Sequence, residues 1–132
     1  MNVLIALQGQ EVMDPDMESL VKYMEQQYPK EAKAHSIAGD YYFKVNQVVE
    51  AVNAYKAALK CDPNVYPIWN QVLALEYQYQ QFDSILVDGE KCISFFPTQP
   101  IPYFIYGSAL NQKKQYQKAL TTLETGVEFV LK

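Results

Sequence analysis

Apolar residues recur at intervals of three and four along most of the chain, and short polar segments interrupt them. This spacing places the apolar side chains on one face of a helix, which is typical of amphipathic helices packed against neighbours. Two stretches show the pattern well: Val48, Ala51, Val52, Tyr55, Ala58 and Leu59 in the first, and Tyr116, Ala119, Leu120, Leu123, Val127 and Val130 in the second.

The pattern predicts a chain made only of helices. A first helix starts after Asp14, a good N-cap residue, with Pro15 in its first turn, and it ends near Tyr28 and Pro29. Residues 1–11 are interpreted as the remainder of its partner helix. Six further helices are predicted near residues 31–44, 47–61, 65–79, 82–95, 100–113 and 116–131. Short polar turns join them in pairs, at Val45-Asn46-Gln47, Tyr79-Gln80-Gln81 and Lys113-Lys114-Gln115.

The helix pairs follow a repeat of 34 residues. Positions that keep this spacing are Pro29, Pro63 and Pro97; His35, Trp69 and Tyr103; Gln47, Gln81 and Gln115; and Ala51, Ile85 and Ala119. Proline lacks the N–H group that a helix interior needs, so each proline marks the end of a unit. Several columns with one period indicate a repeat protein.

A helix–turn–helix unit of this length resembles the tetratricopeptide repeat (TPR) family, whose pattern includes glycine and tyrosine in the first helix and alanines and a proline later. The first full unit matches at Gly39, Tyr42, Ala51, Tyr55, Ala58 and Pro63, and the third keeps Gly107 and Ala119. The second unit departs from the pattern, with Leu73 for glycine, Glu76 for tyrosine and Gly89 for the aromatic residue.

The resemblance implies an all-α fold, a right-handed α-solenoid of antiparallel helix pairs forming one array over residues 1–132. Its units would cover approximately residues 1–31, 32–65, 66–99 and 100–132, the first truncated at its N-terminus. We interpret Gly39 and Gly107 as small residues that face Ala51 and Ala119 and let paired helices approach closely. The large rings are expected to fill the gaps between units.

TPR arrays resemble scaffolds that bind peptides or partner proteins in a concave groove lined by the first helix of each unit. Mixed amide and aromatic side chains suit an extended peptide, whose backbone the amides can hydrogen-bond. The groove positions implied by the resemblance are Lys33, Ser36, Asp40, Phe43, Asn70, Ala74, Tyr77, Phe104, Ser108 and Asn111. Further positions on the same helix faces are Lys44, Pro67, Gln78, Ile101 and Gln112.

Chaperone-binding members of the family hold an acidic C-terminal peptide with a carboxylate clamp of lysines, an arginine and asparagines, because converging cations are needed to bind carboxylates. The corresponding positions here are Ser36, Asp40, Asn70, Ala74, Phe104 and Ser108. Only Asn70 fits a clamp, and Asp40 would repel the ligand. We therefore expect no clamp.

Charge and composition exclude several classes of function. The 132 residues carry a formal net charge of −4, which argues against a nucleic-acid surface. No apolar run is long enough to insert in a bilayer. Cys61 and Cys92 fit neither a disulfide framework nor a metal cluster, and we expect two small, mostly buried thiols. The single histidine, His35, falls in the ring column, where a packed junction residue is favoured over a catalyst.

The sequence thus predicts a non-catalytic scaffold for a protein or peptide partner, with no cofactor or metal, and a segment of a longer bacterial TPR protein. An alternative stays open: a self-assembly module, such as a homodimer, that pairs through exposed terminal helices bearing Leu120, Leu123, Val127 and Val130. The compartment is also open between the cytoplasm and, with a signal peptide upstream, the periplasm or cell envelope.

Overall fold

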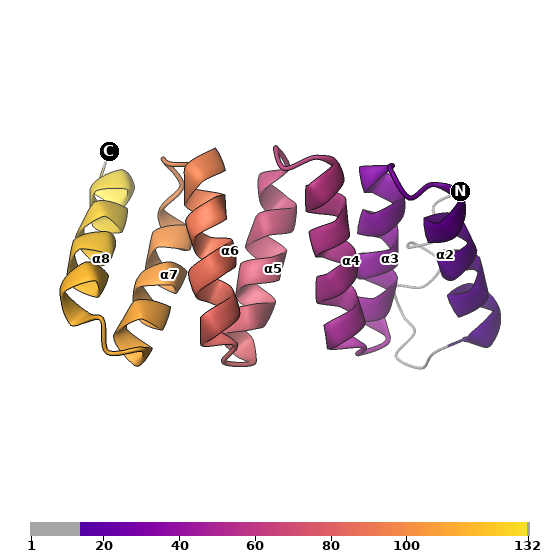
Figure 1. The fold of residues 1–132 in the computed structure, drawn as a ribbon, viewed down its shortest axis with the longest axis horizontal. Coiled ribbons are helices and arrows are strands. Elements are labelled where there is room, and N and C mark those ends of the chain that lie inside the picture. Colours follow the sequence, from indigo (N-terminus) through magenta and orange to yellow (C-terminus); the bar gives the residue numbers. More distant parts are fainter. Residues whose placement is uncertain (1–13, 132) are drawn as a thin grey trace. The chain divides into compact units, whose positions relative to one another are not determined.

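The computed structural model describes residues 14–131, which form seven α-helices and no strand (Figure 1). The helices are α2 (Pro15–Gln27), α3 (Ala32–Lys44), α4 (Val48–Cys61), α5 (Tyr66–Gln78), α6 (Phe82–Phe95), α7 (Pro100–Gln112) and α8 (Tyr116–Leu131). Each end of the last six helices lies within one residue of its predicted position. The partner helix predicted for residues 1–11 lies outside the described residues.

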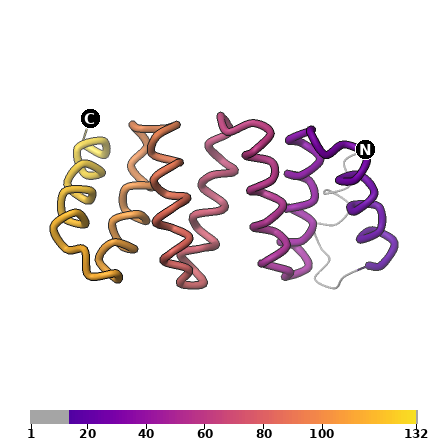
Figure 2. The backbone as a smooth tube through the Cα atoms, viewed as in Figure 1, coloured from indigo at the N-terminus to yellow at the C-terminus, as the bar shows by residue number. Residues whose placement is uncertain are grey.

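The chain divides into two compact parts, a first part that ends at Ile68 and a second part that begins at Trp69, so that the boundary falls inside α5. In the first part, α3 packs against both α2 and α4. In the second part, α7 packs against both α6 and α8. Figure 2 shows consecutive helices within each part running in opposite directions, joined by short connections.

Helix starts follow local chemistry. Asp14 caps α2, and its Oδ1 accepts a hydrogen bond of 2.9 Å from the backbone N–H of Asp16. Pro15 opens that helix, and Pro100 opens α7, at positions where the missing N–H has no partner to lose. The predicted cap and the predicted proline start of α2 are confirmed.

The three turns inside the helix pairs share one backbone conformation. Asn46, Gln80 and Lys114 are left-handed, with φ of 63°, 56° and 65°. In each case the next residue donates its N–H to a carbonyl five residues earlier, at 2.8 to 2.9 Å, which ends the helix in a Schellman motif: Gln47 to Tyr42, Gln81 to Glu76, and Gln115 to Leu110. Turns at these positions were predicted, but no glycine marks their left-handed residue.

Two glycines allow close helix packing, with a different neighbour from the one expected. A Cβ added at Gly39 would lie 2.6 Å from the ring of Tyr55, and one at Gly107 would lie 2.6 Å from Cδ2 of Leu123. The closest contacts are therefore with Tyr55 and Leu123 rather than with Ala51 and Ala119. The small residue accommodates a large side chain one helical turn further along the partner helix.

The pair α5–α6 reverses this arrangement. The position of Gly39 and Gly107 is occupied there by Leu73, which is fully buried, and the position of Tyr55 and Leu123 is occupied by Gly89. A large residue and a small one have exchanged helices. Gly89 faces the next helix along the chain: an added Cβ would lie 3.0 Å from the ring of Tyr106 on α7, so the small residue on α6 makes room for that ring.

Rings stack within helix pairs. Trp69 of α5 stacks on Phe95 of α6 with centroids 6.1 Å apart, and Tyr103 of α7 lies 5.5 Å from Phe129 of α8. The column rings, which were expected to fill gaps between units, thus pack inside the second and third helix pairs, where Phe95 and Phe129 are also 34 residues apart.

The two thiols differ. Cys92 is fully buried in α6, as expected, whereas Cys61 is exposed because it is the last residue of α4. The expectation of a buried thiol was wrong for Cys61. Within residues 14–131, no helix combines the length and the apolar character that crossing a membrane requires.

Candidate functional site

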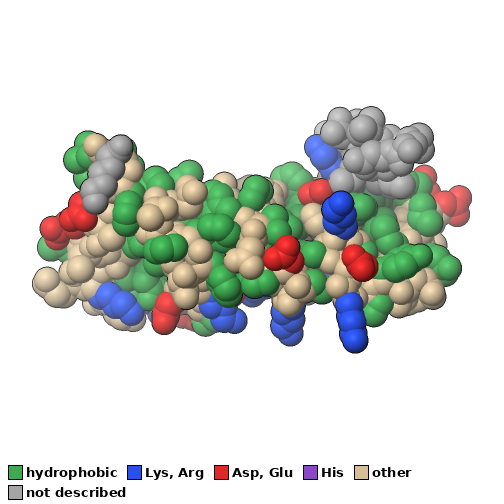
Figure 3. Space-filling view, turned by 90° about the horizontal axis from the view of Figure 1, so that it is seen from above, with side chains coloured by type: hydrophobic (Ala, Val, Ile, Leu, Met, Phe, Trp, Pro, Cys, Tyr) green, Lys and Arg blue, Asp and Glu red, His purple; other side chains and the backbone are tan. Residues whose placement is uncertain are grey.

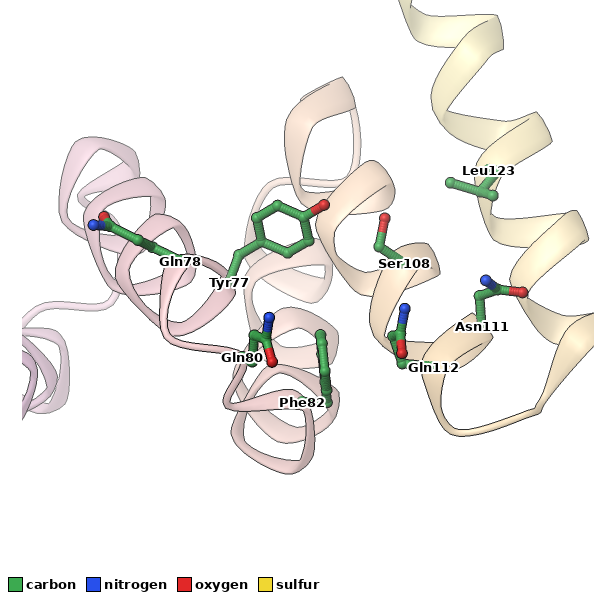
Figure 4. Close-up of a pocket in the computed structure, with 8 residues that line it drawn as sticks. All are labelled: Tyr77, Gln78, Gln80, Phe82, Ser108, Asn111, Gln112 and Leu123. Atoms are coloured by element: carbon green, nitrogen blue, oxygen red, sulfur yellow. The ribbon is translucent and has the colours of Figure 1, made fainter.

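A groove of about 440 Å³ lies in the second part of the chain, lined by residues of four helices and of the α5–α6 turn (Figure 4). Figure 4 shows the side chains from α5, α7 and α8 around it, together with those of the α5–α6 turn and the first residue of α6. The lining residues are Tyr77, Gln78, Gln80, Phe82, Ser108, Asn111, Gln112 and Leu123.

The lining is neutral and mixed. Tyr77, Phe82 and Leu123 contribute apolar surface, whereas four carboxamides and one hydroxyl contribute hydrogen-bonding groups. Each carboxamide has two N–H donors and an acceptor oxygen, so the set can match a peptide backbone, which alternates donors and acceptors. None of the eight lining side chains carries a formal charge.

Three of the ten predicted groove residues, Tyr77, Ser108 and Asn111, meet in this groove. The side chain of Tyr77 is 49% exposed, which leaves its ring available for contact. The Ser108 hydroxyl donates a hydrogen bond of 2.8 Å to the carbonyl of Phe104 in its own helix. The Ser108 hydroxyl is therefore engaged within α7, whereas Tyr77 and Asn111 are exposed in the groove.

Three other predicted residues of the second part do not line the groove. Asn70 is half-buried and Ala74 is exposed on α5. Phe104 is half-buried, and its ring lies against Gly126 of α8, where an added Cβ would be 3.2 Å from the ring. Phe104 thus also contributes to packing between α7 and α8.

The remaining four predicted residues lie on α3 in the first part. Lys33 and Phe43 are exposed, and Ser36 is half-buried. Asp40 accepts a hydrogen bond of 2.5 Å from the hydroxyl of Tyr55. Burial raises the pKa of Tyr55, and the bond to Asp40 raises it further, so the phenol stays protonated and keeps donating.

Gln78 and Gln112 were predicted on the same helix faces and also line the groove, whereas sequence reasoning missed Gln80, Phe82 and Leu123. It considered only the first helix of each unit, whereas the groove also includes the turn and the second helices. Gln80 holds the same position in its repeat as Asn46 and Lys114. This shared position was an available signal, because it marks the turn beside the groove.

Charges lie around the groove rather than in it. Lys113 forms an ion pair of 2.9 Å with Asp83, from the turn after α7 to the first turn of α6. In the face shown in Figure 3, charged side chains are scattered among apolar and neutral ones. Such an exposed ion pair contributes little to stability, but it pairs the ammonium group of Lys113 with the carboxylate of Asp83.

Two carboxylic acids are buried in the same part of the chain, Glu76 on α5 and Asp88 on α6, which are 3% and 4% exposed. Glu76 stands where the family pattern has tyrosine, and that departure was the only sequence signal for it. Among residues 14–131, no group of three or more His, Cys, Asp or Glu side chains is arranged to hold a metal ion.

Comparisons with known proteins identify the repeat. No protein-family model matches the chain. It is 30% identical over 116 residues to Hsp70-Hsp90 organizing protein 3 of Arabidopsis thaliana, covering 86% of this chain and 21% of that protein. It is 24% identical over 101 residues to a TPR repeat-containing protein of Schizosaccharomyces pombe, covering 75% of this chain and 12% of that protein. This chain belongs to the tetratricopeptide-repeat family.

The solved structure of MamA has the same TPR-like fold, with a TM-score of 0.70 and 18% identity over 97% of this chain and 73% of that one. The expected all-α class of paired helices is thereby confirmed. A TPR array is a protein–protein interaction module. The chain spans about a fifth or less of the length of the curated relatives named here. Since these relatives come from a plant and a yeast, the bacterial source stays a prediction.

Proposed function

We propose that the chain is a non-catalytic TPR module that binds a neutral, extended peptide segment of a partner protein in the groove of its second part. The observation that carries the proposal is the uncharged lining, in which two aromatic rings and a leucine side chain stand beside four carboxamides. Apolar contacts supply affinity, and carboxamides that bond the peptide backbone keep it extended.

The name of the Arabidopsis relative refers to Hsp70 and Hsp90. Binding of an acidic C-terminus by the clamp described above would require cations at positions that hold Ala74, Phe104 and Ser108 in this part of the chain. Lys113, in the turn after α7, is paired with Asp83. We therefore propose a neutral peptide rather than an acidic C-terminus as the ligand.

The test is selection from a phage-displayed library that contains free acidic C-termini as well as neutral internal sequences. Affinities of the selected peptides are then measured by fluorescence anisotropy. Tyr77→Ala is compared with Tyr79→Ala, because Tyr79 is 46% exposed, almost as much as Tyr77, but does not line the groove.

We expect neutral peptides whose affinity falls about tenfold or more in Tyr77→Ala and stays unchanged in Tyr79→Ala, as for a central aromatic contact. Selection of acidic C-termini would contradict the proposed ligand. Equal loss in both tyrosine variants, or in Lys114→Ala, would contradict the groove.

A second candidate function, association with another copy, is favoured by one observation on α8. Leu86 and Ile93 of α6 pack against a buried cluster formed by Tyr106, Leu110 and Ala119. Their equivalents one period later are Leu120 and Val127, which are 53% and 46% exposed. The exposed face of α8 therefore carries apolar side chains at the positions that α6 uses to pack against the next helices.

Sedimentation velocity tests this second candidate. We expect a concentration-dependent dimer that Leu120→Glu abolishes and that Thr121→Glu, a neighbouring exposed position, leaves intact. A monomer at tens of micromolar, or equal behaviour of the two variants, would exclude pairing through this face.

A further inference from the structure

The imidazole of His35, at the start of α3, is held between two oxygen atoms. Nδ1 lies 3.0 Å from Oε2 of Glu25 on α2, and Nε2 lies 2.8 Å from the carbonyl oxygen of Pro29 in the α2–α3 connection. Both oxygens only accept. A neutral imidazole has one N–H and can satisfy only one of them, whereas the protonated ring satisfies both.

The residue at the equivalent repeat position in the last helix pair, Tyr103, shows what is unusual about His35. There Tyr103 donates its hydroxyl to the carbonyl of Pro97 at 2.6 Å, and its ring lies against Phe129. One ring thus ties the start of α7 to the connection before it. This hydrogen bond does not depend on pH near neutrality, because a tyrosine hydroxyl ordinarily has a pKa of about 10. Burial raises the pKa of Tyr103 further.

In the first helix pair both members of this arrangement are changed. His35 replaces the tyrosine, and Cys61 occupies the position of Phe95 and Phe129. The Cys61 thiol, at the end of α4, also points to the Pro29 carbonyl, with Sγ 3.6 Å from the oxygen. The Pro29 carbonyl is therefore shared by α3 and α4, and the His35 ring connects it to Glu25 of α2.

The electrostatic surroundings favour the charged ring. Burial lowers the pKa of His35, but the hydrogen bond to Pro29 and the bond and charge of Glu25 together outweigh it, and the pKa is raised above 6.5. The other titratable groups nearby are Tyr42 on α3, whose pKa is raised by burial and by Glu25, and the Cys61 thiol. Lys22 on α2 is engaged by Glu18 at 3.1 Å.

We propose that His35 is a pH-dependent latch that holds α2 against α3, closed when the ring is protonated and weakened when it is neutral. The contribution to α2 docking is complete below the unfolded-state pKa and is lost as the pH rises through the higher folded-state pKa. Loss of the second N–H leaves an imidazole lone pair facing an oxygen, so either the Glu25 bond or the Pro29 bond breaks.

Opening of the latch has a defined structural consequence. Helix α2 buries Val21 and covers Tyr41 of α3, whose hydroxyl donates a hydrogen bond of 3.3 Å to the carbonyl of Asp14. Release of α2 would uncover this face of α3, including the buried ring of Tyr41. The first part of the chain would then gain an exposed apolar surface once the His35 ring is deprotonated.

Hydrogen exchange of the α2 amides between pH 6 and pH 8.5, corrected for intrinsic rates, tests the latch in the intact chain. We expect the opening constant of α2 to rise with pH by up to about tenfold per unit between the two pKa values, while amides of α7 stay constant. In His35→Tyr, which copies the tie of Tyr103, the pH dependence should disappear.

NMR titration of the His35 ring keeps the test decisive should His35→Tyr fold poorly. We expect a pKa above 6.5 in the wild type and a lower one in Glu25→Gln, because the amide removes the negative charge. A wild-type value at or below 6.5, an unchanged value in Glu25→Gln, or the same pH-dependent opening of α2 in His35→Tyr would overturn the latch.

Discussion

The hydroxyl of Tyr55 on α4 donates a hydrogen bond of 2.5 Å to Oδ1 of Asp40 on α3, while its ring lies against Gly39, the residue before Asp40. One side chain thus uses two consecutive residues of the partner helix: glycine makes room for the ring, and aspartate receives the hydroxyl. Asp40 was expected in a ligand groove, but the structure gives it a role within the helix pair.

Removal of the Tyr55 hydroxyl should destabilise the first part of the chain. Tyr55→Phe keeps the ring against Gly39 but leaves the half-buried carboxylate without this donor. We expect a loss of about 1–2 kcal/mol, the lower range for a hydrogen bond to a charged acceptor that is partly exposed. Urea unfolding measures it. Asp40→Asn, which retains an acceptor oxygen, should lose less, and an equal or larger loss there would contradict this account.

The effect of a methyl group at Gly107 should depend on Leu123. Gly107→Ala places a Cβ 2.6 Å from Cδ2 of Leu123, and we expect destabilisation of about 1–3 kcal/mol from overpacking. In the Leu123→Ala background the clash is gone, so the same substitution should stabilise by up to about 1 kcal/mol through helix propensity. Urea unfolding of the four proteins gives the coupling. Simple additivity would contradict the contact.

The left-handed turn residues offer a stabilising change. Lys114 has a φ of 65°, a conformation that costs a side chain with a Cβ but not glycine. Lys114→Gly should therefore raise the free energy of unfolding by about 1 kcal/mol. Asn46→Gly should raise it less, because asparagine tolerates this conformation better than lysine. Thermal unfolding with both variants checks the order, and a destabilised Lys114→Gly would show that the turn is not left-handed.

The two cysteines should react at very different rates. Burial raises the pKa of the Cys92 thiol to about 12, and its side chain is inaccessible, whereas Cys61 is exposed. Iodoacetamide at pH 8 should modify Cys61 in the native chain and reach Cys92 only after denaturation, since the thiolate is the reactive form. Peptide mass spectrometry follows both sites. Native labelling of Cys92 at the rate of Cys61 would contradict its burial.

Helix boundaries and turn positions could be predicted because they depend on local chemistry. Asp14 and Pro15 define the start of α2 through a side-chain cap and a fixed φ, and the 34-residue period located the remaining helices. The groove was only partly predictable. Tyr77 and Asn111 follow from their helix face, but Phe82 and Leu123 reach the groove through the packing of second helices, which no local signal reports.

The sequence by itself determined the seven described helices, their pairing by short turns and the repeat that relates them, because each depends on residues close together in the chain. Only the tertiary structure decided that Tyr55 and Leu123 fill the space at Gly39 and Gly107, and that both nitrogens of His35 face oxygen acceptors. These contacts join different helices or helix and connection. The distance and direction between their atoms are set by side-chain packing, which the spacing of residues along the chain does not specify.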